Sequence, residues 1–400
     1  MTDNYAIYMA LGISFFFLLS SLPTSKKPYL IFLGFGITSA LMTLARSDGL
    51  LWLGLSLLVA LWWAGTQVNT ASPQPATPNL QRSTFNVQHL PRILSSFIFY
   101  LFFLLLGYFL LMSPWYARNL SVFGSFMAPG GSRALWLTNY NDTFVYPASQ
   151  LTMQSWLASG WNAILLARLG ALGINLLNAF AAQGGIFLFP FILVGLWQLR
   201  KDVRLRFAAL AWIMLLAAMT IVFPFAGARG AFFHAGAALQ PVWWAVAPIG
   251  LEAVVGAIRR RGWLDERAFV IFRGALVSVA VLMTAVIFII RVLPGWERED
   301  GRYAAVENFI VQQGAPSGAV IIVRNPPGYN IVTGRPAIAL PAGGIPAILT
   351  VAARYNAHYL ILEPEGMSAG LRVLYDQPYQ FPVIRYLGES DGNRLYEIIR

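Results

Sequence analysis

The stretch Ser113–Pro147, SPWYARNLSVFGSFMAPGGSRALWLTNYNDTFVYP, decides how the rest of the chain is organised. It follows a long apolar run and combines two arginines, Asn119, a Gly-Gly-Ser turn, several aromatic side chains and Asp142. Most of the sequence on either side of it is apolar, apart from a polar tail. We therefore interpret the stretch as a polar, aromatic loop that emerges from a membrane, with a surface suited to a polar head group.

The composition indicates a membrane protein. Of the 400 residues, 57% are hydrophobic and only 11% are charged, whereas soluble domains carry about 25% charged residues. The net charge of +11 comes from lysines and arginines spread over short loops. Such spacing is typical of membrane topology and disfavours nucleic-acid binding. The absence of cysteine excludes disulfides and thiol catalysis.

Eight apolar runs predict the membrane-spanning helices, each close to the roughly 20 residues that a span requires. The runs are Ala6–Leu22, Tyr29–Ala45, Leu50–Gly65, Ile93–Trp115, Gly184–Leu199, Phe207–Gly227, Ala237–Ile258 and Ala268–Leu293. The predicted fold class is an α-helical polytopic membrane protein with about eight transmembrane helices and a small C-terminal α/β extracytoplasmic domain.

Basic residues on alternate loops predict the orientation, because positively charged loops stay in the cytoplasm. The richest loops lie around Lys26, Arg82, Lys201 and Arg260. Both termini and the loop 113–183 are then external. We expect a multi-pass protein of the plasma (inner) membrane.

Two segments within the predicted transmembrane region, residues 1–296, differ from the apolar runs. Residues 66–91 are rich in proline and polar side chains and are interpreted as a cytoplasmic linker. Trp161–Gln183 carries leucines at helical spacing, and we interpret it as an external helix that lies along the membrane interface.

The composition changes after Trp296, and residues 297–400 are predicted to form a soluble external α/β domain of about 100 residues. The expected elements are helices at Tyr303–Gln312 and Ile345–Tyr355, a turn at Asn325–Gly328, and strands at Ala319–Val323, near Ala337, and at Tyr359–Leu362, Val383–Leu387 and Arg394–Ile399.

Two acidic positions on the external side are candidates for chemistry. Asp3 precedes the first helix, where a solvated helix cap is the simpler explanation. Asp48 lies two residues after Arg46 in a tight turn, so that the two side chains either serve a function, pair with each other or cap the next helix.

The run from Arg229 to His234 is the third external candidate. A guanidinium group suits phosphate oxygens, and neighbouring glycines allow close approach of a ligand. A membrane-edge arginine beside a hydrogen-bonded histidine is the structural alternative. A metal role for His234 has no supporting ligand spacing.

Several of these runs together resemble the multi-spanning GT-C glycosyltransferases, in the group of dolichyl-phosphate-mannose-protein mannosyltransferases and aminoarabinose-transferase-like proteins. The resembling runs are TDNY at 2–5, LARSDGL at 44–50, SPWYARN at 113–119, SRALWLTNYND at 132–142, RGAFFH at 229–234 and NPPGY at 325–329. Their order and their predicted side of the membrane carry the resemblance, which covers nearly the whole chain.

The resemblance implies transfer of a sugar from a polyprenyl-phosphate-linked donor to a glycan, lipid or protein acceptor. Such chemistry needs a carboxylate to accept the proton of the acceptor hydroxyl, and positive charge on the phosphate. The catalytic carboxylates implied are Asp3 and Asp48. The residues implied at the donor phosphate are Arg229, His234, Arg118 and Arg133, and those implied in the loop for the acceptor or head group are Trp115, Asn119, Asn139 and Asp142. Asp3 is also the implied ligand of a divalent cation, Mg²⁺ or Mn²⁺.

The family carries its main acidic residue in a loop after an earlier first helix, which this sequence does not contain. We therefore expect an N-terminally shortened relative that lacks this residue. The alternative function is a non-catalytic membrane scaffold whose external α/β domain binds a partner or a glycan. A transporter is disfavoured because no carboxylate lies at a predicted mid-membrane position.

Overall fold

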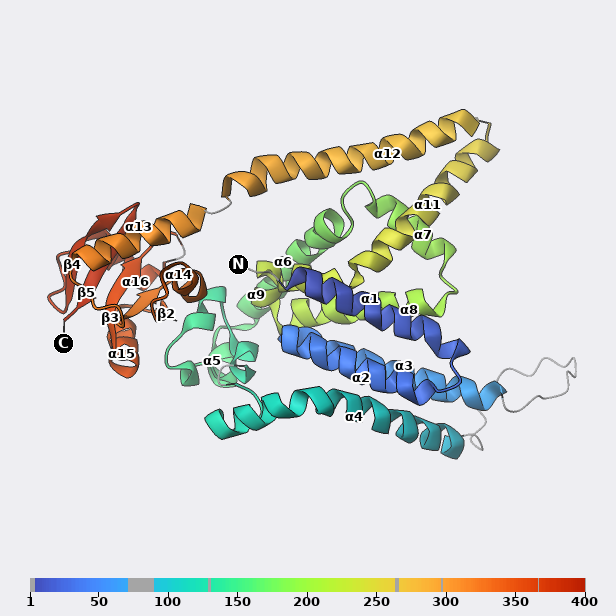
Figure 1. The fold of residues 1–400 in the computed structure, drawn as a ribbon, viewed down its shortest axis with the longest axis horizontal. Helices are drawn as coiled ribbons and strands as arrows, with labels where there is room; N and C mark the ends of the chain where they lie inside the picture. The colour runs from blue at the N-terminus through green and yellow to red at the C-terminus, as the bar shows by residue number, and fades with distance from the viewer. Residues whose placement is uncertain are drawn as a thin grey trace, which may run out of the picture. The chain divides into compact units, whose positions relative to one another are not determined.

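A computed structural model describes residues 4–70, 90–128, 131–262, 266–295, 298–365 and 367–399 (Figure 1). Asp3 and most of the predicted linker 66–91 lie outside the described residues. The chain divides into two compact units, which we describe separately. The helical unit comprises Thr2–Ala128 and Leu165–Gly274, and the sheet unit comprises Pro129–Ile164 and Ala275–Arg400.

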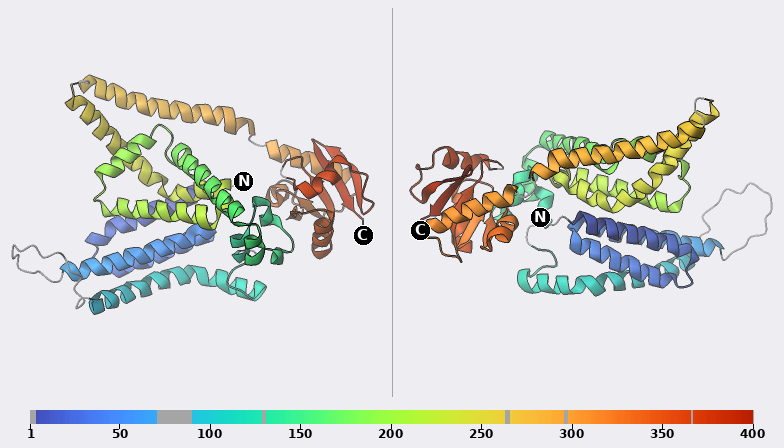
Figure 2. Two further views of the ribbon diagram at one scale, coloured as in Figure 1. Left: turned by 180° about the vertical axis from the view of Figure 1, so that it is seen from behind. Right: turned by 45° about the horizontal axis from the view of Figure 1, so that its top comes forward.

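Four long helices form the first half of the helical unit: α1 (Tyr5–Ser21), α2 (Pro28–Ala45), α3 (Leu50–Thr70) and α4 (Leu90–Phe123). Helix α2 lies between α1 and α4 in Figure 1 and in the right view of Figure 2. A Cβ atom at Gly36 of α2 would lie 2.0 Å from the Leu104 carbonyl oxygen of α4. This close backbone contact is the small-residue packing found between membrane helices.

The second half of the helical unit contains shorter and more broken helices. They are α6 (Trp161–Asn178) with a π-helical extension (Ala179–Gln183), α7 (Phe189–Gln198), α8 (Val203–Ala217) with its π-helical extension (Ala218–Val222), α9 (Pro224–Ala226), α10 (Phe232–Gly236), α11 (Gln240–Arg260) and α12 (Glu266–Ile287). Helix α12 begins in the helical unit and ends in the sheet unit.

Eight helical segments of the described chain are long and apolar enough to cross a membrane, which indicates a multi-pass membrane protein. Seven of them overlap predicted spans. The predicted span Gly184–Leu199 is not among the eight, because its helix α7 has only 10 residues and covers about 15 Å. The eighth segment is Trp161–Gln183, with 23 residues. The positive φ angles of Gly185 and Ile186 break the helix between the two segments.

Trp161–Gln183 forms the predicted helix, and its position along the membrane interface stays a prediction. Leu165, Leu166 and Leu169 are exposed, while Asn175 is buried within the helical unit. The Asn175 side-chain amide donates to the Met219 carbonyl oxygen at 3.2 Å. The helix is therefore packed into the bundle through a polar side chain and directs its leucines outward.

Two predicted loop boundaries change as well. Helix α3 runs to Thr70 and α4 starts at Leu90, so both ends of the predicted linker are helical. Helix α4 continues past Pro114 to Phe123, which places Trp115, Arg118 and Asn119 on a helix instead of in a loop. The irregular segment of Ser113–Pro147 begins only after this helix ends.

The sheet unit contains the predicted α/β domain. Its five strands are β1 (Val320–Val323), β2 (Ala337–Ala339), β3 (Ala357–Leu362), β4 (Ile384–Ser390) and β5 (Asn393–Ile398), in the order β2-β1-β3-β5-β4. Strand β1 is parallel to β2 and β3, whereas β5 is antiparallel to β3 and β4. The helices are α13 (Arg298–Gln312), α14 (Pro326–Thr333), α15 (Ile345–Tyr355) and α16 (Ala369–Asp376).

The two faces of this sheet have separate cores. Ile321 and Ile361 pack on one side with α13 and α14, and Ile322 and Leu360 pack on the other with α15 and α16. The alternation follows from the two-residue period of a strand. Because both faces are buried, β1 is apolar at every position.

The predicted turn Asn325–Gly328 is the start of a helix. Asn325 is the N-cap residue of α14, and its side-chain oxygen accepts from the backbone N–H of Gly328 at 3.2 Å. Proline has no backbone N–H to donate, and in the first turn of a helix that group has no partner within the helix, so the two prolines fit there. Helix capping explains this run, which removes the reason to regard it as a binding loop.

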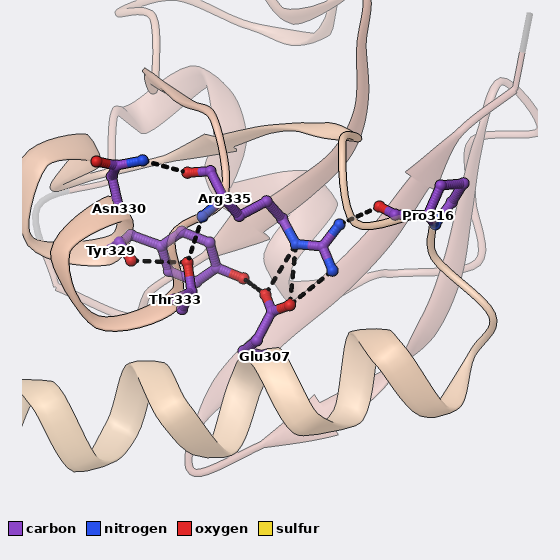
Figure 3. A network of polar contacts seen from close by, with 6 residues as sticks. All are labelled: Glu307, Pro316, Tyr329, Asn330, Thr333 and Arg335. Carbon is purple, nitrogen blue, oxygen red and sulfur yellow. Dashed lines mark hydrogen bonds and ion pairs between the residues drawn. The ribbon is translucent and has the colours of Figure 1, made fainter.

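A buried polar network joins α13 to the β1–β2 region (Figure 3). Arg335, only 3% exposed, donates through Nε and Nη2 to the Glu307 carboxylate at 3.0 and 2.6 Å. Its Nη1 donates to the Pro316 carbonyl oxygen, and the Tyr329 hydroxyl donates to Glu307 at 2.6 Å. This network fixes α13, the helix that follows α12, against its domain.

Part of the predicted external loop belongs to the sheet unit. Residues 131–164 contain three short 3₁₀ turns and α5 (Met153–Ala158). Val145 forms a parallel bridge with Ala342, and the Phe144 carbonyl accepts from the Ala342 N–H at 2.8 Å. The loop 113–183 is thus divided: its helical start and end lie in the helical unit and its middle lies in the sheet unit.

Candidate functional site

The turn between α2 and α3 contains a short ion pair. Arg46 donates through Nε to Asp48 Oδ1 at 2.8 Å, and the two side chains are 16% and 6% exposed. The Arg46 guanidinium also lies 5.8 Å from the centre of the Tyr8 ring. The carboxylate is therefore shielded from solvent, and its negative charge is balanced by one arginine.

The start of α1 completes the surroundings of this pair. The Tyr8 hydroxyl donates to Asp48 Oδ2 at 3.5 Å, at the upper limit for a hydrogen bond. The Asn4 side-chain amide donates to the Ala45 carbonyl at 2.9 Å and holds the α1 terminus against the end of α2. Of the two Asp48 oxygens, Oδ2 thus has the longer contact.

The second component is the run Arg229–His234, which crosses from a π-helical turn into α10. Gly230 has φ of 117°, a value that L side chains rarely adopt, so the backbone turns sharply there. Arg229 is exposed, whereas His234 is half-buried and its ring lies 5.0 Å from that of Phe233. The turn presents its arginine outward and keeps its aromatic rings against the bundle.

The two components meet at one end of the bundle. Arg46 Nη2 donates to the Ala231 carbonyl oxygen at 3.2 Å. The Tyr5 ring stacks on Phe233 with centroids 5.1 Å apart and meets His234 edge-on at 6.3 Å. The structure thereby brings together the predicted residues Asp48 and His234 with the turn that carries Arg229.

A buried glutamine supports this turn from within the bundle. Gln183, 2% exposed, donates through Nε2 to the Phe232 carbonyl at 3.3 Å. Its Oε1 accepts from the Trp212 indole N–H at 2.9 Å, and its backbone carbonyl accepts from the Gln240 amide at 2.7 Å. The position of the Arg229–His234 run is therefore connected to α8, α11 and the end of α6.

The predicted residues on α4 form their own small group. The Arg118 guanidinium lies 5.3 Å from the Trp115 ring and 5.5 Å from the Phe123 ring, and it donates to Asn119 Oδ1 at 3.2 Å. Asn119 is 1% exposed and donates to the Phe126 carbonyl. Asn119 is therefore a structural residue that holds the chain after the end of α4, while Arg118 lies close to aromatic rings.

The predicted residues of the loop are held by local contacts in the sheet unit. Asp142 Oδ2 accepts from the Thr138 N–H at 2.8 Å, and Asp142 Oδ1 accepts from the Asn139 amide at 2.7 Å, within a capping box. Arg133 donates to the Leu151 carbonyl at 2.8 Å. Turn formation accounts for Asn139 and Asp142, so neither needs a ligand to explain its position.

The predicted metal role of Asp3 cannot be placed, because Asp3 lies outside the described residues. Within the part of the chain that the structure covers, no group of three His, Asp or Glu side chains could hold a metal ion. Asp48 directs its oxygens to Arg46 and Tyr8 instead.

Sequence reasoning missed Tyr8 and Gln183. Tyr8 lies within an apolar run, and its contact with Asp48 spans 40 residues. Only Gln183 could have been found from the sequence, because a polar side chain at the end of an apolar helix requires hydrogen-bond partners.

No family model, curated protein or solved structure matches the chain.

Proposed function

We propose that the chain is a membrane glycosyltransferase that moves a sugar from a polyprenyl-phosphate-linked donor to an acceptor hydroxyl on the external membrane face. One observation carries the proposal: the Arg46–Asp48 pair and the Arg229–His234 run, 185 residues apart, meet at one end of an apolar bundle. A carboxylate beside cationic side chains at that position suits a lipid-linked phosphate substrate.

The roles follow from the chemistry of transfer. The acceptor oxygen attacks the anomeric carbon, the bond from that carbon to the phosphate oxygen breaks, and the bonding electron pair leaves with the phosphate. Asp48 Oδ2 takes the acceptor proton, because Arg46 occupies Oδ1. Arg229, with His234 beside it, stabilises the leaving phosphate. We derive no step through a metal ion.

The distribution of basic residues supports the external placement. Lys26 and Lys27 follow α1, Lys201 precedes α8, and Arg259 and Arg260 end α11. Positive residues at those ends favour the cytoplasm. Arg46 follows the end of α2 opposite Lys27, and Arg229 lies before the start of α11, whose other end carries Arg259, so we assign Arg46 and Arg229 to the external side.

Arg118 and Arg133 have different places in this proposal. Arg118 belongs to the helical unit and lies between two aromatic rings, an arrangement that suits an extended sugar or phosphate contact. Arg133, Asn139 and Asp142 belong to the sheet unit, where local turn and loop contacts hold them, and we give them no role in transfer.

The test is a transfer assay with the full chain in phospholipid vesicles, a panel of radiolabelled polyprenyl-phosphate sugars and a membrane extract as acceptor. We expect labelled product, and a loss of about 10²-fold or more with Asp48→Asn, the typical contribution of a general base. Asp142→Asn is the matched control, because Asp142 is a local cap, and it should keep its activity.

Binding of glycans or lipid phosphate without any labelled product would favour the alternative, a non-catalytic membrane binding protein. Equal activity of Asp48→Asn and the unchanged chain would remove Asp48 from the mechanism.

A further inference from the structure

Three tyrosines of the sheet unit form a column from its core to its surface. Tyr396 of β5 is fully buried, and its hydroxyl donates to the Leu374 carbonyl oxygen at 2.9 Å. The Tyr386 ring of β4 packs on it with the ring centroids 5.4 Å apart. The Tyr379 ring lies 5.2 Å from that of Tyr386, at an interplanar angle of 86°, and Tyr379 is 83% exposed. The outermost ring is therefore supported from the core and open to solvent.

Tyr379 belongs to a short turn between α16 and β4. The Gln377 carbonyl oxygen accepts from the Gln380 N–H at 3.2 Å, which closes a turn of four residues. Pro378 occupies the second position of this turn, where its fixed φ is favourable. A ligand that stacks on Tyr379 would meet a ring whose backbone is already held in place, which lowers the entropic cost of binding.

Polar groups lie beside this column of rings. Burial raises the pKa of the Tyr386 hydroxyl, and the nearby Arg394 and Glu389 act on this pKa in opposite directions. Arg394 Nε lies 3.4 Å from Glu389 Oε2, and the Glu389 side chain is 47% exposed. The Arg394 guanidinium lies 4.3 Å from the centre of the Tyr375 ring. We call Tyr379, Tyr386, Glu389 and Arg394 the tyrosine patch.

The charges at the tyrosine patch are balanced. Glu389 pairs with Arg394, and on the neighbouring helix α16 Arg372 pairs with Asp376 at 3.6 Å. A balanced surface does not attract the phosphates of a nucleic acid. The guanidinium of Arg394 also disfavours the cationic ligands that aromatic cages bind. The patch therefore suits a neutral ligand that has an apolar face and several hydroxyl groups.

We propose that the tyrosine patch binds a neutral sugar residue. The C–H face of a pyranose ring stacks on the Tyr379 ring, whose face carries negative charge density. The hydroxyls of the sugar donate to the Glu389 carboxylate, which is an acceptor only. The inference goes beyond the proposed function, because the patch belongs to the sheet unit and binding there needs no lipid-linked donor.

The experiment measures binding to the full-length protein in phospholipid nanodiscs by titration calorimetry. The probes are soluble oligomers of glucose, mannose, galactose and N-acetylglucosamine, together with a polyproline peptide. Tyr379→Ala removes the outer ring, whereas Tyr379→Phe keeps the ring without its hydroxyl. Ile331→Ala is the matched control, because Ile331 is 75% exposed on α14, which packs on the opposite face of the sheet.

We expect at least one oligosaccharide to bind, and Tyr379→Ala to weaken that binding about fivefold or more, as the loss of a stacked ring implies. Tyr379→Phe and Ile331→Ala should stay within about twofold of the unchanged chain. Both positions are exposed, so all four proteins should unfold at nearly the same temperature.

Three outcomes would overturn the inference. They are the failure of every oligosaccharide to bind, equal affinity of Tyr379→Ala and the unchanged chain, and binding of the polyproline peptide in place of the sugars. None of them decides the proposed function, because the assay contains no lipid-linked donor, and transfer is measured separately.

Discussion

Arg46 donates one hydrogen bond to Asp48 and another to the Ala231 carbonyl oxygen, at 2.8 and 3.2 Å. One guanidinium group thereby links the α2–α3 turn to the Arg229–His234 run. Because the planar fork has several donors in fixed directions, a single side chain can serve both partners. The geometry of the candidate site depends on this arginine.

Arg46→Lys should therefore impair the site although it keeps the charge. A lysine ammonium cannot hold the Asp48 and Ala231 oxygens with the same fixed geometry, and we expect transfer to fall about tenfold or more. The measurement is kcat in the vesicle assay. Arg200→Lys, which replaces an exposed arginine bonded to the Trp197 carbonyl, is the control. Equal rates for both variants would show that the fork is dispensable.

Gln183→Leu should destabilise the helical unit. The replacement leaves the Trp212 indole N–H and the Phe232 carbonyl without their partner, and each buried unsatisfied group costs about 1–3 kcal/mol. Thermal unfolding in detergent should show a Tm lower by several degrees, at about 2–4 °C per kcal/mol. Gln198→Leu at the exposed end of α7 should leave Tm nearly unchanged. A similar Tm for both variants would contradict the role of Gln183.

Gly250→Ala should separate α7 from α11. A Cβ atom at Gly250 would lie 1.8 Å from the Phe191 carbonyl oxygen, so the helices must move apart. Gly256→Ala on the same helix is the control, because its Cβ would meet only the Arg260 side chain, at 3.7 Å. We expect only Gly250→Ala to lower the Tm. Its free energy of unfolding should fall by an amount typical of overpacking, about 1–3 kcal/mol. If both alanine variants unfold alike, the close helix contact is wrong.

The sheet unit should lose stability at alkaline pH. Burial, and then the hydrogen bond to Glu307, raise the pKa of Tyr329 above its ordinary value near 10. The unfolded tyrosine ionises first, so the stabilising contribution is complete below pH 10 and is lost as pH rises through the folded pKa. Tyr329→Phe should flatten this slope in urea unfolding monitored between pH 8 and about pH 11.

Two observations complete that test. Tyr379→Phe changes a tyrosine that is 83% exposed, so the alkaline slope should stay as in the unchanged chain. Arg335 shares the Glu307 carboxylate, whose hydrogen bonds raise the pKa of the Arg335 guanidinium, so it keeps its charge throughout. An unaltered slope in Tyr329→Phe would exclude this tyrosine as the titrating group.

Periodicity and composition predicted much of the architecture. Ile345–Tyr355 forms α15 with the predicted bounds, and the strands of the tail lie where apolar β-branched runs occur. The short helix α16 was missed, although Leu371 and Leu374 are buried at helical spacing. Hydropathy separated Trp161–Gln183 from the next apolar run, but it could not predict that α7 starts only at Phe189, because the break depends on the backbone angles of Gly185 and Ile186.

The candidate site was less predictable, since it depends on contacts between distant residues. The sequence identified Asp48 and the Arg229–His234 run as polar groups at the ends of helices, yet their contact through Arg46 is tertiary. Asn119, Asn139 and Asp142 have the residue types of a ligand site, but local capping and turn contacts account for them. Residue type alone cannot distinguish a cap from a ligand.

The most direct test of the central claim is the affinity of the full-length protein in nanodiscs for farnesyl phosphate, with and without Arg229→Ala. Arg206→Ala, which removes an exposed arginine at the start of α8, is the control. The proposed function predicts that Arg229→Ala weakens binding about tenfold or more, a loss of at least about 1.4 kcal/mol of binding free energy. Arg206→Ala should have no effect. Equal affinity of the unchanged chain and Arg229→Ala would contradict a lipid-phosphate site at this turn.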